Sequence, residues 1–171
     1  MPETSFPLPP IIDVEASGFG SSSYPIEVGL VLADGQSYCS LIQPEDEWQH
    51  WDADAEKVHG LKRDTLAAHG RSAVEVAREV NQRLRGQVVY TDSWYHDFTW
   101  LSRLFDAGES APSFRLEDLR SLLSEKEADN WHQAKTQVLA ELNLPRHRAS
   151  NDARVLQMTL KRVKQMDALA S

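Results

Sequence analysis

The segment Pro10–Ala16 constrains the fold most, because this short apolar run carries two acidic residues, Asp13 and Glu15. Apolar runs of this length and composition are typical of buried β-strands. Side chains alternate between the faces of a strand, so residues two apart point the same way. Two carboxylates held together in an apolar strand repel each other and lose hydration unless a cation lies between them. A divalent metal site and a hydrated strand edge explain this pair about equally well.

The rest of the first half predicts an antiparallel meander followed by helices and a further strand. Strands are expected at Tyr24–Ala33 and Gln36–Gln43, because Asp34-Gly35 between them is a strong hairpin signal. A fourth strand is expected at Gln87–Thr91, beside the first. The helices predicted between them are Asp54–Val58, Arg63–His69 and Ser72–Arg85, the last capped by Ser72 and ended by Gly86.

The second half predicts helices to the end of the chain. Their expected ranges are Tyr95–Ala107, Leu116–Ser124, Glu127–Leu142 and Asp152–Met166, with a break at Pro145. Strands, helices, a strand and more helices is the order of an α/β domain with a mixed central sheet. A chain of 171 residues buries one substantial core, so we expect a single domain over residues 1–171, with residues 1–9 as an extended lead.

Two further acidic segments are candidates for chemistry. Asp97 falls in the first turn of a predicted helix, where the helix dipole stabilises a negative charge. His147 precedes Asp152 by five residues, and a loop before the helix would let the imidazole turn back toward the carboxylate. Ordinary explanations exist for each. Acidic residues are favoured at helix starts, Asp92 is an equally available carboxylate, and His147 stands between two arginines that could form a solvent-facing cluster.

Taken together, the three acidic segments resemble the DnaQ-like exonucleases of the DEDDh type, which have an RNase H-like fold. The matching motifs, in the family's order, are DVEASG, HDFTWL and HRASNDA. Between the first two, AEKVHGLKRDTL resembles the family's segment around a His-Gly pair. The resemblance extends over about residues 11–166, and it predicts an α/β fold with an RNase H-like mixed central sheet flanked by helices.

The resemblance implies a metal-dependent 3′-5′ exonuclease that releases nucleoside 5′-monophosphates from single-stranded or frayed nucleic-acid ends. Two Mg²⁺ or Mn²⁺ ions would be held by Asp13, Glu15, Asp97 and Asp152, and His147 would activate the attacking water. Substrate contacts would come from Ala16, Ser17, Gly18, Phe19 and His59, with Phe19 stacking on a base.

The chain departs from the family pattern mainly in the second motif. Relatives often have G-H-N followed by F-D, whereas this chain has Thr91, Asp92 and Ser93, with His96 before the aspartate. Ala16 stands where the family usually has Thr or Ser. The nearby Trp94, Tyr95 and Trp100 are interpreted as core packing rather than as base-stacking groups. Two alternative functions stay open: a catalytically weak nucleic-acid-binding module, and a two-metal phosphoesterase acting on small nucleotides.

Net charge and composition limit the kind of nucleic acid that the protein could bind and the cellular compartment in which it is expected. A net charge of -8 and a pI of about 5.2 argue against gripping long duplexes through many phosphates, so nucleic-acid contact should be local. One cysteine, Cys39, excludes an internal disulfide, and neither a membrane span nor a leader is expected, which predicts a soluble, cytoplasmic protein. Several small relatives of the family are homodimers, so the resemblance makes a homodimer plausible. Spacing does not distinguish DNA from RNA.

Overall fold

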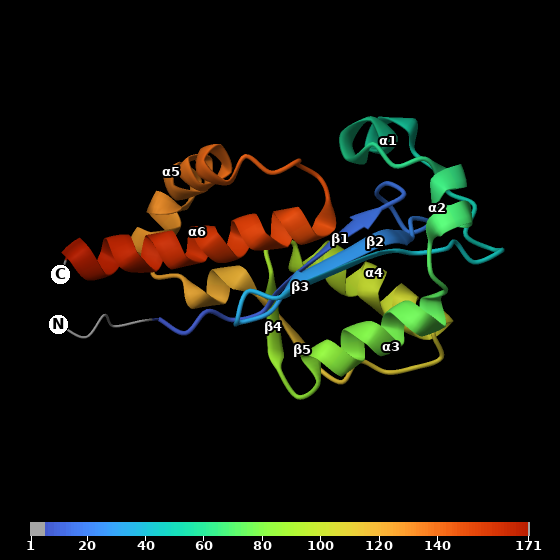
Figure 1. Cartoon of the computed structure of the whole chain (residues 1–171), viewed down its shortest axis with the longest axis horizontal. Coiled ribbons are helices and arrows are strands. Elements are labelled where there is room, and N and C mark those ends of the chain that lie inside the picture. The colour runs from blue at the N-terminus through green and yellow to red at the C-terminus, as the bar shows by residue number, and fades with distance from the viewer. Residues whose placement is uncertain (1–5, 171) are drawn as a thin grey trace.

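The structure is a computed structural model that describes residues 6–170 and is built around a mixed five-stranded sheet (Figure 1). The strands are β1 (Ile11–Ala16), β2 (Pro25–Val31), β3 (Ser37–Leu41), β4 (Val88–Thr91) and β5 (Arg115–Asp118). Their order across the sheet is β3-β2-β1-β4-β5. The pairs β1–β2 and β2–β3 are antiparallel, whereas β1–β4 and β4–β5 are parallel. The predicted meander and the predicted fourth strand beside the first are confirmed.

Helices cover both faces of this sheet. The helices of the described residues are α1 (Ala53–His59), α2 (Arg63–His69), α3 (Ala73–Leu84), α4 (Trp94–Ala107), α5 (Glu125–Leu142) and α6 (Ala149–Ala170), with a 3₁₀ helix, η1, at Leu119–Leu122. The short helices α1 and α2 lie beyond the ends of β1 and β2 (Figure 1). In Figure 1, α3 and α4 lie on one side of the sheet, and α5 and α6 lie on the other. The Ser72 hydroxyl accepts the Glu75 N–H at 3.2 Å, which confirms the predicted cap of α3.

The hairpin between β2 and β3 has the expected turn chemistry. Gly35 has a φ of 89°, and its N–H donates to the Leu32 carbonyl at 3.0 Å. The Asp34 carboxylate accepts the Gln36 N–H at 3.0 Å. Aspartate and glycine therefore close this turn for the physical reasons that the sequence predicts.

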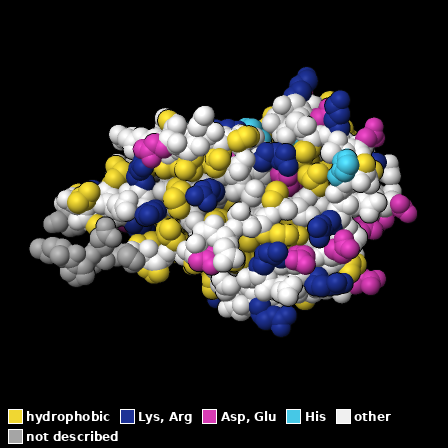
Figure 2. Space-filling model, in the orientation of Figure 1, with side chains coloured by type: hydrophobic (Ala, Val, Ile, Leu, Met, Phe, Trp, Pro, Cys, Tyr) yellow, Lys and Arg dark blue, Asp and Glu magenta, His cyan; other side chains and the backbone are white. Residues whose placement is uncertain are grey.

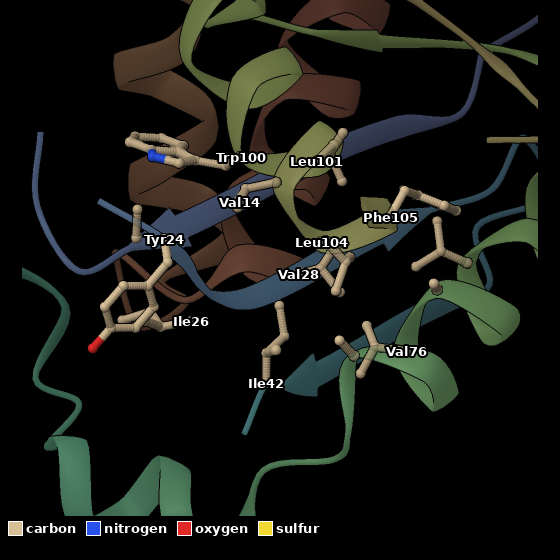
Figure 3. Close-up of a cluster of buried hydrophobic side chains, with 14 of the residues drawn as sticks. Val14, Tyr24, Ile26, Val28, Ile42, Val76, Trp100, Leu101, Leu104 and Phe105 are labelled. Atoms are coloured by element: carbon tan, nitrogen blue, oxygen red, sulfur yellow. The ribbon is translucent and has the colours of Figure 1, made fainter. Parts of the chain in front are cut away.

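Alternation along β1 divides its side chains between two hydrophobic clusters. Ile12 and Val14 belong to the larger cluster, packed with residues of α3 and α4 such as Val76 and Leu104 (Figure 3). Ile11 belongs to a second cluster with Leu156 and other residues of α6. Asp13 and Glu15 share the face of Ile11, because they differ from it by two and four positions. Both acidic side chains therefore point to the side of the sheet that α6 covers.

The neighbouring strand β2 follows the same division and lets α6 approach closely. Val31 packs in the α6 cluster, and Gly29 and Glu27 share its face. A Cβ atom at Gly29 would lie 2.1 Å from the Ser150 nitrogen and 2.3 Å from the Ala149 carbonyl carbon. The first turn of α6 therefore rests directly on the backbone of β2, at a position where only glycine fits.

One predicted element is wrong. The helix predicted over Leu116–Ser124 is instead the end of strand β5 followed by η1. The segment pairs with β4 in parallel, with Val89 opposite Leu116 and Thr91 opposite Asp118. Pairing at the edge of the sheet overrides a local pattern that lacks strand alternation.

Two further expectations concern the N-terminal lead and membrane-spanning helices. The predicted lead of residues 1–9 lies partly outside the described residues, and residues 6–10 form neither helix nor strand. Within residues 6–170, none of the helices combines the length and the apolar composition needed to cross a bilayer.

The Gly29→Ala substitution tests the contact between β2 and α6. We expect it to lower the free energy of unfolding by about 1–3 kcal/mol and to reduce amide hydrogen-exchange protection in the first turn of α6, because the added methyl group overlaps that backbone. Gly35→Ala is the control, since its Cβ meets nothing within 4 Å and only its positive φ is strained. Unchanged protection at Ala149–Asp152 in Gly29→Ala would contradict the assignment.

Candidate metal centre

Three carboxylates from two elements converge beside the first turn of α6. Asp13 and Glu15 come from β1, and Asp152 comes from the start of α6. One carboxylate oxygen from each residue lies within 4.8 Å of the other two. Asp13 and Glu15 therefore point the same way, as strand alternation predicts, and Asp152 of the third motif lies beside them.

Asp97 lies next to this group but is not a member of it. It is 1% exposed in the first turn of α4, and its Oδ2 atom accepts the Thr91 hydroxyl at 2.5 Å. Asp97 is the charged neighbour that raises the pKa of Asp13 most. Asp92, the alternative candidate, is exposed to solvent and acts on Asp13 more weakly. The structure therefore places Asp97, rather than Asp92, in the interior beside the three carboxylates.

Burial and mutual repulsion make these carboxylates weak acids. Burial raises the pKa of Glu15 to about 8, and the negative charge of Asp152 adds to the shift. Burial also raises the pKa of Asp97 to about 8, against the lowering effect of the Thr91 hydrogen bond. The pKa values of Asp13 and Asp152 are raised by burial as well. Four neighbouring acidic groups with raised pKa values need either protons or a cation.

The donor set fits a hard divalent cation. Asp13 Oδ2 is buried and has no hydrogen-bond partner among the described residues. A buried carboxylate oxygen without a donor is unusual, because such groups are nearly always paired. Carboxylate oxygens are the ligands that Mg²⁺ and Mn²⁺ prefer. The cluster of Asp13, Glu15 and Asp152 could therefore hold a metal ion, with Asp97 within electrostatic reach.

The segment before α6 is held in place by an ion pair between buried Glu27 and half-buried Arg148. Glu27 on β2 is fully buried, and its carboxylate accepts from Arg148 Nη2 at 2.7 Å and from the Ala149 N–H at 2.7 Å. His147, directly before Arg148, has a φ of 60°, and its N–H donates to Asp152 Oδ1 at 3.2 Å. A non-glycine residue in the left-handed region persists only where its surroundings fix it. The predicted turn of His147 toward Asp152 is thus present in the backbone.

The predicted substrate residues after Glu15 differ widely in exposure. Ala16 and Ser17 are buried, and the Ser17 hydroxyl pairs with His50 Nδ1 at 2.9 Å and accepts the Tyr24 N–H at 3.1 Å. Gly18 is buried, and a Cβ there would lie 2.7 Å from that of Asp52. Phe19 is 69% exposed. Of these four residues, Phe19 is the one whose side chain is open to a ligand.

Three rings at the start of α4 are exposed as well. Tyr95 is 74% exposed, Phe98 48% and Trp94 37%, whereas Trp100 is 8% exposed. The sequence interpretation of Trp94 and Tyr95 as core packing is therefore wrong, while Trp100 is buried as expected.

His59 presents a buried donor near the base candidate. Its Nδ1 atom accepts the Leu61 N–H at 3.0 Å, so the proton of the neutral ring sits on Nε2, which is buried without a partner among the described residues. Burial lowers the pKa of His59, and a positive charge on His147 would lower it further. This N–H could therefore donate to an acceptor on a bound molecule.

Two residues that position the site, Glu27 and Arg148, are not predicted by the sequence motifs. Glu27 is an isolated carboxylate in the apolar strand PIEVGLV, and this signal could have predicted a buried cationic partner. The sequence predicts a basic cluster around His147, whereas Arg148 pairs with Glu27. Thr91, noted as a departure from the family motif, donates to Asp97. The Thr91 hydroxyl thus helps to hold Asp97 in place.

Comparisons with known proteins establish the fold. No family model matches the chain, and no curated protein matches it by sequence. Solved structures of exonuclease I are similar: the Methylocaldum szegediense enzyme (TM-score 0.68, 12% identity), the zinc-bound E. coli enzyme with ssDNA (0.66, 12%) and the E. coli enzyme with a 5cy-dT13 oligonucleotide (0.69, 12%). They match 91–92% of this chain, which spans 40% of the length of each. The RNase H-like fold expected from the motifs is therefore confirmed.

The raised pKa values predict how stability depends on pH and metal. Glu15 has an ordinary pKa of 4.5 and a folded pKa of about 8, so between these values the folded state binds more protons than the unfolded state. The free energy of unfolding should therefore fall as pH rises from about 5 to 8 in chelator. Each kcal/mol lost lowers the Tm of a chain of this size by roughly 2–4 °C. Mg²⁺ or Mn²⁺ should restore the Tm most at the higher pH.

Thermal unfolding followed by circular dichroism checks this, with Glu15→Gln as the control because its neutral amide removes one titrating group. The pH slope should be shallower in that variant. A Tm that rises with pH in chelator would show that the carboxylates are not clustered as described.

Proposed function

We propose that this protein is a metal-dependent 3′-5′ exonuclease that hydrolyses phosphodiester bonds at the ends of nucleic acids. The observation that carries the proposal is the convergence of Asp13, Glu15 and Asp152, with Asp97 alongside, around a buried and unpartnered carboxylate oxygen. A phosphodiester is an anion, and it approaches four carboxylates only where cations neutralise them. The solved structures of exonuclease I with oligonucleotides share the fold and support the same class of substrate.

The carboxylates in this proposal are ligands for two Mg²⁺ or Mn²⁺ ions. Asp13, Glu15 and Asp152 would share one ion, and Asp97, whose charge acts on Asp13, would extend the donor set. When bound, such ions stabilise the attacking and leaving oxygens of an in-line phosphoryl displacement. The product would be a nucleoside 5′-monophosphate.

His147 is the proposed general base. Its backbone N–H is tied to Asp152, so the residue is fixed next to a proposed metal ligand. The role of the imidazole is to accept the proton of the attacking water. His59 Nε2 would donate to an oxygen of the terminal nucleotide, which gives its buried N–H an acceptor. Phe19 would stack on the terminal base.

The proposal is tested by incubating the protein with 5′-labelled single-stranded DNA and RNA in Mg²⁺, Mn²⁺ or chelator. We expect a ladder that shortens from the 3′ end only with metal, and the better substrate identifies the preferred sugar. Intact strands with a folded protein would favour the nucleic-acid-binding module instead. Cleavage of a mononucleotide ester but of no oligonucleotide would favour the small-nucleotide phosphoesterase.

Single substitutions in the site give a second prediction. Asp13→Ala, Asp97→Ala and Asp152→Ala should abolish cleavage, because each removes a proposed ligand, while His147→Ala should lower kcat on the order of 10²–10⁴-fold. Asp92→Ala is the matched control, since Asp92 is an exposed carboxylate in the same segment as Asp97. Single-turnover rates and circular dichroism measure both effects. Loss of activity in Asp92→Ala but not in Asp97→Ala would overturn the assignment of the second motif.

A further inference from the structure

A cleft that is open to solvent lies between α3 and the segment that follows α4. Its volume is about 400 Å³, which is in the range of small-ligand sites. The residues that line it from the α3 side are Val74, Arg78, Asn81, Gln82 and Arg85. The opposite wall consists of Gly108 and Ser110. We call this site the α3 cleft. None of its lining residues is acidic, although the chain carries a net charge of -8.

The two arginines reach the cleft from one face of α3. Arg85 follows Arg78 by seven residues, so at 100° per residue their directions differ by only about 20° around the helix axis. Two helical turns, about 10 Å, separate them along the axis. Val74, four residues before Arg78, places an apolar side chain that is 44% exposed on the same face. One helix face therefore offers two guanidinium groups and an apolar contact to a single ligand.

No carboxylate neutralises these two guanidinium groups. Among residues 6–170, Arg78 and Arg85 form no ion pair, and their side chains donate no hydrogen bond. Glu79, next to Arg78 in the sequence, is paired with Arg83 instead. An anion that enters the cleft would therefore meet positive charge and N–H donors that no protein group already satisfies.

The opposite wall of the cleft is fixed to α3 by Asn81. Its Nδ2 atom donates to the Ala111 carbonyl at 2.9 Å, and its Oδ1 atom accepts the Ser113 N–H at 2.8 Å. The Ser113 hydroxyl donates to the Asn81 carbonyl at 3.0 Å. Gly108 lies so close to α3 that a Cβ there would be 2.9 Å from that of Ala77. Because these contacts hold the wall in place, the cleft is formed before a ligand binds and little ordering is required.

The α3 cleft is separate from the candidate metal centre. Helices α3 and α4 cover one face of the sheet, whereas Asp13 and Glu15 point to the face that α6 covers (Figure 1). Asp97 is in the first turn of α4, and Gly108 follows its last turn. The helix between these residues spans roughly 16 Å at 1.5 Å per residue. A ligand in the cleft therefore does not occupy the place of a ligand at the carboxylates.

Charge and size favour a small molecule with a phosphate group as the occupant. Each guanidinium presents paired N–H donors that match two oxygens of one phosphate, so two arginines suit a compact dianion. On the face in Figure 2, the Lys and Arg side chains are interspersed with Asp and Glu rather than gathered in one band. A long polyanionic strand, which needs many phosphate contacts, is therefore disfavoured.

We propose that the α3 cleft binds the dianionic phosphate group of a small molecule. Arg78 and Arg85 hold the phosphate, and Val74 and the Gln82 amide contact the organic part of a phosphate monoester. The site is additional to the proposed nuclease function and does not depend on it, because binding is measured without metal and without cleavage.

Amide NMR spectra of ¹⁵N-labelled protein in chelator test the proposal, with thymidine 5′-monophosphate, inorganic phosphate and thymidine as separate probes at neutral pH. Without metal, the carboxylates of the metal centre repel a phosphate. We expect both phosphate-bearing probes to shift the amide signals of Gln82, Gly108 and Ser110, and thymidine to shift none of these. Tighter binding of the monophosphate would identify a monoester as the ligand, and equal binding would identify free phosphate; both outcomes support the site.

The variant Arg78→Gln/Arg85→Gln removes both guanidinium groups and retains polar side chains that are compatible with a helix. Arg120→Gln/Arg154→Gln is the matched control, because it removes the same charge from two exposed arginines outside the cleft. The cleft variant should bind thymidine 5′-monophosphate on the order of tenfold more weakly for each guanidinium removed. The control should bind it like the parent protein.

Three results would overturn the proposal. The first is equal binding by the cleft variant and the control, both shown by circular dichroism to be folded. The second is that the phosphate-bearing probes shift no amide signals of the cleft. The third is an oligothymidylate without a terminal phosphate that shifts the cleft signals more strongly than the monophosphate, since a phosphodiester strand would then be the occupant. None of these results depends on whether the protein cleaves nucleic acid.

Discussion

The ion pair between buried Glu27 and half-buried Arg148 is the interaction on which the arrangement of the site depends. A carboxylate at a fully buried position on β2 needs donors, and Arg148 together with the Ala149 N–H supplies them. Because Ala149 begins α6, the bonds that satisfy Glu27 also fix where that helix starts. Asp152 is three residues further along the helix and therefore arrives opposite β1. Gly29, which admits no side chain, lets the same turn touch the sheet. The hydrogen bonds that Glu27 on β2 needs thus position Asp152 beside the carboxylates of β1.

Only part of the electrostatic repulsion in the site is neutralised by a basic residue. Glu15 lies opposite Glu27 across the β1–β2 pair, so two acidic residues face α6 side by side. Arg148 neutralises Glu27, whereas Glu15 is left with further carboxylates and a pKa of about 8. A protein stabilised only by its own contacts would place a basic residue here as well. The uncompensated carboxylates are instead consistent with a cation site. Without a cation they destabilise the folded state, and a bound cation would stabilise it.

Sequence reasoning succeeded where local periodicity decides structure and failed where a partner far along the chain decides it. Alternation on β1 and the Asp34-Gly35 turn define the meander, and the fold class follows from the order of elements. Leu116 joins a strand only because β4 pairs with it, and nothing in RLEDLR alternates strongly enough to show this. The role of Arg148 depends on a residue 121 positions away, which no spacing within the motif reveals. Exposure of Tyr95 depends on how α4 rotates against the sheet, and aromatic content alone predicts burial.

The carboxylates and the exposed rings occupy different layers of this molecule, and this explains how Asp97 can keep its place while the residues around it depart from the family pattern. The carboxylates stand on β1 and on the first turns of α4 and α6, where backbone pairing, buried bonds and close packing fix their positions. Phe19 and Tyr95 project outward from the same elements, so substituting them leaves the interior packing largely untouched. A fold of this kind hosts many functions, because the outer layer can vary while the inner one is constrained.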